Sequence, residues 1–82
     1  MIDHRRRLLS RAALGTEGRI TLERAPDRAW PGDHSRLCAL ENDGDLLFLG
    51  EQPGSRPGGV AAAWCLTPQG RAALLDASPA RA

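Results

Sequence analysis

The 82-residue chain lacks lysine and tyrosine and has few aromatic residues or cysteines. Because its aromatic residues are only Trp30, Phe48 and Trp64, the core has to be built mainly from leucine and alanine. No apolar run approaches the roughly 20 residues that a membrane span needs. Two cysteines, Cys38 and Cys65, do not make a disulfide framework, and we expect free thiols in a reducing cytoplasm. The sequence therefore predicts a soluble, cytoplasmic single domain.

The charge of the chain is nearly balanced but unevenly distributed. A net charge of +1 gives no global field that would draw the protein onto nucleic acid or an anionic membrane. Arginines concentrate before residue 30, whereas acidic residues dominate from 33 to 51. All 11 basic residues are arginines, which is typical of GC-rich coding but also provides the better fork for phosphate or carboxylate.

The first third of the chain predicts a helix, a short strand and a one-turn helix. An apolar stripe predicts the first helix over about residues 3–14, and Gly15 ends it. Residues 19–21 are expected to add a short strand. Thr21 resembles the N-cap of a helix over residues 22–25, which Pro26 would stop after one turn.

The middle of the chain predicts a loop followed by a longer helix. The loop spans residues 26–33, with its turn at Pro31 and Gly32. Asp33 or Ser35 is expected to cap the helix, because both side chains accept hydrogen bonds from the first helical amides. Gly44, which tolerates a positive φ, is expected to end it.

The last third predicts a β-hairpin that leads directly into a helix. Two β-favouring segments, 46–52 and 60–67, flank the turn-forming sequence PGSRPGG. Pro68 cannot donate to a β-ladder but fits the first turn of a helix, with Thr67 as its cap. We assign residues 1–76 to one domain and expect 77–82 to be a flexible tail.

This predicted order resembles the winged helix-turn-helix regulators of the MarR and PadR kind. The segments LENDGDL (residues 40–46) and LTPQGRAALL (66–75) resemble the family's Leu-Glu-x-x-Gly-Leu and LTxxGR signatures. The resemblance extends from about Arg6 to Leu75. It implies an α+β fold, namely a small winged helix with a three-helix core, a two-stranded wing and a short C-terminal helix.

The resemblance also implies a function. Members of this family are transcriptional regulators that bind double-stranded DNA, so we expect a small bacterial or phage regulator, with a homodimer possible. In such proteins the third helix enters the major groove, and wing arginines enter the minor groove. The matching DNA-binding positions are His34, Ser35, Arg36, Arg28 and Arg56.

A second interpretation remains open from the same residues. Pro26 shortens the second helix, with Trp30 expected to fill the gap as a core residue, and acidic residues surround the third helix. An acidic surface opposes phosphate binding. The alternative is a winged-helix protein-interaction module, such as a phage or mobile-element accessory or inhibitor protein, that does not bind DNA.

Catalysis and metal binding have little support in the sequence. His34 and Cys38 lie four residues apart on one helical face, and Cys65 lies on a strand expected nearby, so a zinc ion or a Cys–His dyad is conceivable. A complete set of ligands is missing. We therefore predict no enzymatic activity, no metal site and no cofactor.

Overall fold

The computed structural model describes residues 3–76, which form three α-helices and one three-stranded antiparallel sheet. In chain order the elements are α1 (His4–Leu14), the 3-10 turn η1 (Thr16–Gly18), β1 (Arg19–Arg24), α2 (Gly32–Asn42), β2 (Leu46–Pro53), β3 (Val60–Leu66) and α3 (Pro68–Asp76). The expected tail at 77–82 lies outside the described residues. The small α+β class is thus confirmed, in a domain that measures 48 × 27 × 21 Å.

The predicted first helix is confirmed as α1. The Asp3 carboxylate caps it by accepting a hydrogen bond of 3.0 Å from the Arg6 amide. Leu8, Leu9 and Ala12 form its buried face, because residues four apart lie on the same side of a helix. The apolar stripe in the sequence therefore marks the face that packs on the sheet.

The predicted helix after Thr21 is wrong, because β1 continues through Arg24. Its residues pair with β3 from Arg19 opposite Cys65 to Arg24 opposite Val60. A single helical turn makes too few internal hydrogen bonds to be stable, whereas the ladder satisfies the backbone along the whole strand. As a result, the described residues contain three helices instead of the expected four, and the hairpin belongs to a three-stranded sheet.

Helix α2 follows the predicted loop, but its start differs from the prediction. The N-cap is Pro31, no side chain caps the helix, and neither Asp33 nor Ser35 has that role. Asp33 instead accepts hydrogen bonds from two arginines. At the other end the prediction is confirmed, because Gly44 has a φ of 90° and its amide bonds to the Glu41 carbonyl at 3.0 Å.

The predicted hairpin of β2 and β3 is confirmed, and β3 lies at the centre of the sheet in the order β1-β3-β2. Trp64 on β3 faces Ile20 on one side and Phe48 on the other. A bulge interrupts β2 between Phe48 and Gly50, where Gly50 has a φ of 115°. A residue without a Cβ suits this conformation, and the bulge bends the edge strand.

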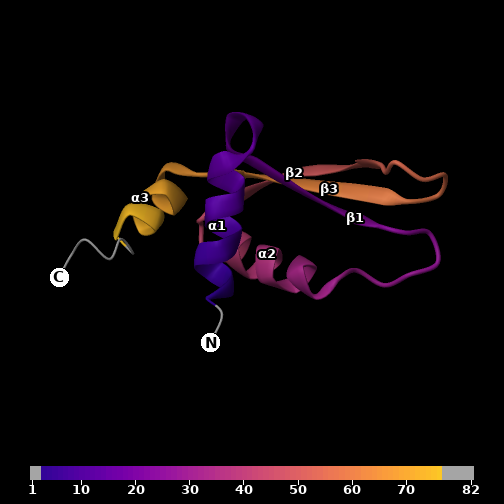
Figure 1. Ribbon diagram of the computed structural model, residues 1–82, viewed down its shortest axis with the longest axis horizontal. Coiled ribbons are helices and arrows are strands. Elements are labelled where there is room, and N and C mark those ends of the chain that lie inside the picture. Colours follow the sequence, from indigo (N-terminus) through magenta and orange to yellow (C-terminus); the bar gives the residue numbers. More distant parts are fainter. Residues whose placement is uncertain (1–2, 77–82) are drawn as a thin grey trace.

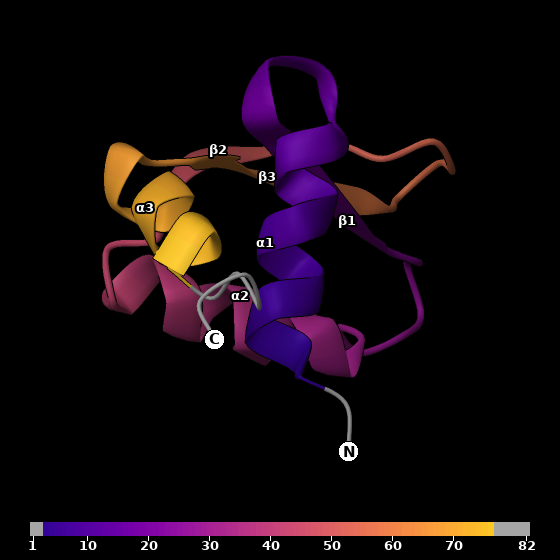
Figure 2. The ribbon, with the colours of Figure 1, turned by 60° about the vertical axis from the view of Figure 1, so that its left-hand side comes forward.

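The two faces of the sheet have different environments. Ala62, Trp64 and Leu66 are buried on the side where the helices lie, while Ala63 and Cys65 between them are half-buried on the other side. Figures 1 and 2 show α2 and α3 on the same side of the sheet, with α1 crossing beside them. We call the side that carries Ala63 and Cys65, with their exposed cross-strand neighbours Arg19, Thr21 and Leu47, the uncovered face.

The core lies between this sheet and the helices. Its largest side chain is Trp64, which is 1% exposed, as the strand alternation predicts. The indole Nε1 donates a 3.1 Å hydrogen bond to Glu41 Oε1, which satisfies its polar atom. Trp30 packs against the core but is only half-buried, so its expected role as a core residue is partly confirmed.

The predicted switch from strand to helix at Thr67 and Pro68 is confirmed. The Thr67 hydroxyl accepts a 3.0 Å hydrogen bond from the Gly70 amide and donates one of 2.6 Å to the Gly44 carbonyl. Pro68 is the first residue of α3. Thr67 thus caps α3 and, through its bond to Gly44, connects the start of this helix to the turn before β2. Within residues 3–76, no helix combines the length and hydrophobicity required to cross a membrane.

Candidate nucleic-acid interface

A series of ring contacts anchors the N-terminal end of α2. The rings of Trp30 and His34 stack with centroids 4.2 Å apart and planes inclined by 17°. His34 also meets Trp64 edge-on at 5.9 Å, while the Arg24 guanidinium lies 5.5 Å from the centre of a Trp30 ring. His34, one of the predicted DNA-binding residues, is therefore half-buried and holds the 25–31 segment against the core.

The next two predicted residues, Ser35 and Arg36, are exposed on the first half of α2. The Ser35 hydroxyl bonds weakly to the Gly32 carbonyl, at 3.4 Å. Arg36 Nη1 donates to Asp33 Oδ1 at 2.8 Å, and 44% of the arginine side chain is exposed. Both side chains therefore face solvent near the start of the helix.

Asp33 joins α2 to α1. Its two carboxylate oxygens accept hydrogen bonds of 2.7 and 3.2 Å from Arg7, in addition to the bond from Arg36. Hydrogen bonding to Arg7 is the largest cause that lowers the pKa of Asp33, from 3.8 to about 2, and Arg36 adds to it. The carboxylate is consequently ionised and compensated at neutral pH.

Other acidic residues near α2 also have partners inside the domain. Glu41 accepts the bond from Trp64, and the buried Asp45 accepts bonds of 2.9 and 3.2 Å from Arg5. Asp45 also accepts a 3.1 Å bond from the Gln69 amide. Most of the acidic side chains that the sequence places around α2 therefore form internal contacts instead of an acidic surface.

Two turns, residues 25–31 and 54–59, pack against each other at one end of the sheet. We call them the distal turns. The Ser55 amide and hydroxyl donate hydrogen bonds of 3.0 and 2.8 Å to Glu23 Oε1, which lower the pKa of Glu23. A Cβ placed on Gly58 would lie 3.2 Å from Pro26 Cβ, so these two turns are in close contact.

The remaining two predicted residues, Arg28 and Arg56, are exposed, one in each distal turn. Figure 1 shows these turns at the end of the sheet toward which the start of α2 points. Arg28 and Arg56 thus lie in two adjoining turns at this end of the sheet, whereas His34, Ser35 and Arg36 lie on the first half of α2, where His34 is packed against tryptophan. Sequence reasoning missed Arg24, whose guanidinium bonds to the Arg28 carbonyl at 3.3 Å, because it placed that residue in a helix. The alternation of RITLER was the signal that could have found it.

The conceivable Cys–His site lacks a third ligand. Cys38 Sγ lies 3.9 Å from His34 Nδ1, but Cys65 faces the opposite side of the sheet from the core in which His34 packs. Burial, and to a lesser extent Glu41, raise the pKa of the Cys38 thiol, which disfavours the nucleophilic thiolate. Among residues 3–76, no three potential ligands lie close enough together to hold a metal ion.

Comparisons with known proteins found no matching family model, no similar curated protein and no similar solved structure.

Proposed function

We propose that this protein is a small winged-helix DNA-binding protein, consistent with a bacterial or phage transcriptional regulator. The observation that carries the proposal is the packing of the distal turns against each other, since one of them, 25–31, leads directly into α2. This packing puts Arg28 and Arg56 in adjoining turns, and Ser35 and Arg36 are exposed on the first half of α2, whose start points toward that end of the sheet. A helix N-terminus flanked by cationic side chains suits a duplex, whose phosphates and grooves are both negative.

The internal partners of the acidic residues support the same proposal. Asp33 keeps its bonds to Arg7 when Arg36 turns toward DNA, so the Asp33 carboxylate stays compensated. Breaking the exposed ion pair between Arg36 and Asp33, so that Arg36 can contact DNA, costs only about 0.2–1 kcal/mol, because such pairs are weak in water. Arg36 then serves as the base-reading residue on α2, through a bidentate contact to guanine.

Salt-dependent fluorescence anisotropy on a labelled duplex tests this function. Contacts from Arg28 and Arg56 to two phosphates would give a slope of about −2 for log K against log salt concentration. Arg28→Ala and Arg56→Ala are each expected to reduce that slope by about one. Arg11→Ala is the matched control, because Arg11 is an exposed arginine in the last turn of α1, away from the distal turns. Absence of binding at low salt would contradict the proposal.

Arg36→Ala tests sequence recognition separately. On a preferred site selected from random duplexes, we expect a loss of about 1–3 kcal/mol and a relaxed preference at one base pair. An equal loss on preferred and random duplexes would instead assign Arg36 to phosphate contact. Arg19→Ala serves as the control, because Arg19 is exposed on the uncovered face of the sheet.

The alternative is a winged-helix protein-interaction module that does not bind DNA. The observation that favours it is the distal turn 25–31, because the related fold has at this point in the chain order a helix that supports the recognition helix. Anisotropy that stays at the value of the free duplex for wild type and all variants would favour this module over the regulator.

A further inference from the structure

The two edges of the sheet differ sharply in polarity. The side chains of Arg19, Thr21 and Glu23 are exposed along β1, so this edge is polar and charged. Along β2, by contrast, three consecutive apolar side chains are exposed: Leu47 by 56%, Phe48 by 40% and Leu49 by 44%. Charged residues along an edge strand normally prevent pairing with another strand, whereas a run of exposed apolar residues on such a strand is a template for it.

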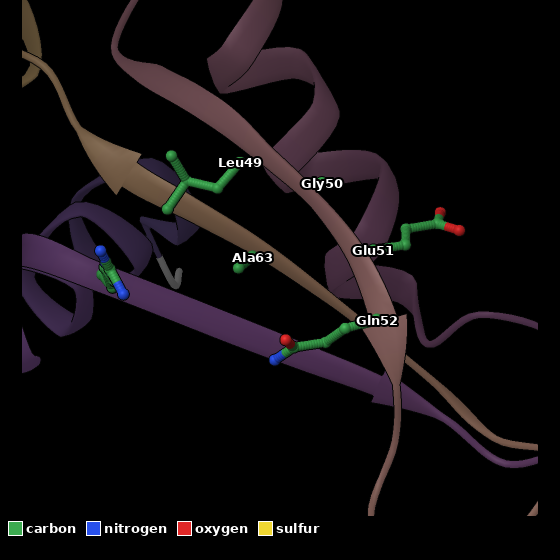
Figure 3. A pocket seen from close by; sticks show the side chains of 6 residues that line it. Leu49, Gly50, Glu51, Gln52 and Ala63 are labelled. Atoms are coloured by element: carbon green, nitrogen blue, oxygen red, sulfur yellow. The ribbon is translucent and has the colours of Figure 1, made fainter.

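The exposed leucines lie next to a shallow hollow on the uncovered face. Figure 3 shows the Leu49 side chain reaching across β3 beside Ala63, with Glu51 directed away from that face. The small residues Ala63 and Gly50 leave a hollow of about 370 Å³ there. The edge and the adjoining face together form a continuous surface that no residue between 3 and 76 covers.

We infer that β2 pairs antiparallel with β2 of a second copy of this chain, which joins two three-stranded sheets into one. A two-fold axis at Phe48 sets Leu47 of each copy opposite Leu49 of the other, so apolar side chains meet apolar side chains. Such an interface is isologous, because the same surface is used twice. The association does not depend on DNA binding.

Charge complementarity favours a second copy over an unrelated peptide. Because the two strands run antiparallel, the exposed Glu51 after the bulge lies near the start of β2 in the other copy, next to Asp45. Asp45 is buried there and already bonded to Arg5 and Gln69, whereas half of the Arg5 side chain is exposed. Glu51 of one copy therefore approaches the half-exposed side chain of Arg5 in the other, twice per dimer.

The bulge limits the length of this pairing. Gly50 bends β2, and Pro53 at the end of the strand has no amide to donate. Backbone pairing is consequently confined to residues 46–49, and Glu51 reaches the other copy through its side chain alone. So short a contact makes a weak, concentration-dependent dimer, since interfaces of small area are usually transient.

Sedimentation velocity over a series of concentrations from micromolar to millimolar tests the inference. We expect the wild-type sedimentation coefficient to rise toward that of a dimer. Leu47→Lys should weaken the dimer by about tenfold or more, because it places an ammonium group in the apolar contact. Thr21→Lys is the matched control: Thr21 is an exposed residue on the same face but on the β1 edge, and its substitution should leave the dimer unchanged.

A second variant tests the charge pairs without altering the apolar contact. Glu51→Gln should weaken the dimer severalfold and reduce its dependence on salt, because it removes both attractions to Arg5. Far-UV circular dichroism checks that each variant is folded. Wild type that remains monomeric up to millimolar concentration would overturn the inference. So would a dimer that Thr21→Lys disrupts or that Leu47→Lys leaves intact.

Discussion

The two ends of the sheet are held together by different kinds of contact. At the helical end, Leu8, Leu37 and Trp64 are buried in a core between the sheet and the helices. At the distal end, Gly59 is the one buried residue of the two turns. Hydrogen bonds from Ser55 join the turn 54–59 to Glu23 on β1, and Gly58 contacts Pro26 in the other turn. The free energy of folding is therefore concentrated at the helical end, and the distal end is free for the DNA contacts that we propose.

Trp64→Ala is expected to have the largest effect on stability. It removes the largest fully buried side chain and its contacts with His34 and Phe48. Truncation of a buried tryptophan costs about 3–5 kcal/mol, a large part of the stability of a small domain. Urea unfolding should show a much lower midpoint, with loss of the whole domain in one transition. A wild-type midpoint would mean that Trp64 lies on the surface and that the strand register is shifted by one residue.

Asp45→Ala is expected to have the next largest effect, also at the helical end. It removes the acceptor of bonds from Arg5 on α1 and Gln69 on α3, so two helices lose their link to the start of β2. The expected loss is about 1–3 kcal/mol, because both donors can turn to water. Asp43→Ala is the control, since Asp43 is exposed two residues away and should cost less than about 0.5 kcal/mol. Equal losses in the two variants would show that the link through Asp45 is unimportant.

Asp33 lies between the two ends, and its effect should depend on pH. Hydrogen bonds from Arg7 and then Arg36 lower its pKa in the folded protein to about 2, below the ordinary 3.8. A lowered pKa contributes stability that is fully present above the unfolded value and is lost as pH falls toward the folded one. The melting temperatures of wild type and Asp33→Asn should thus differ at pH 5 and converge between about pH 4 and 2. The exposed Asp27→Asn serves as the control. A difference that stays constant with pH would contradict this assignment.

The sequence predicts the helical end well, because local signals and packing agree there. The apolar stripe of α1, the positive φ of Gly44 and the cap at Thr67 each depend on residues that are close in the chain. These signals needed no knowledge of distant partners. As a result, the bounds of α1, the end of α2 and the start of α3 follow from the sequence.

The distal end is predicted less well, because distant residues decide its structure. Thr21 resembles a helix cap, yet pairing with Ala63 on β3, more than 40 residues away, makes it part of a strand. Asp33 resembles a cap too, but its carboxylate accepts hydrogen bonds from Arg7 on another helix instead. Local propensity is outweighed in both places by contacts that the order of residues does not reveal. The positions of Arg28 and Arg56 depend on this same pairing.

The smallest expected effect on stability is that of Arg56→Ala at the distal end. Arg56 is exposed in the turn between β2 and β3, and its charge only helps to lower the pKa of Glu23, after the hydrogen bonds from Ser55. Exposed substitutions of this kind usually change stability by less than about 0.5 kcal/mol. Thermal unfolding should therefore match wild type, while the salt slope for duplex binding falls by about one. This variant thus tests stability and DNA binding separately. A lowered melting temperature would show that the distal turns contribute to the stability of the whole sheet. An unchanged salt slope in a fully stable variant would instead remove Arg56 from the DNA-binding surface.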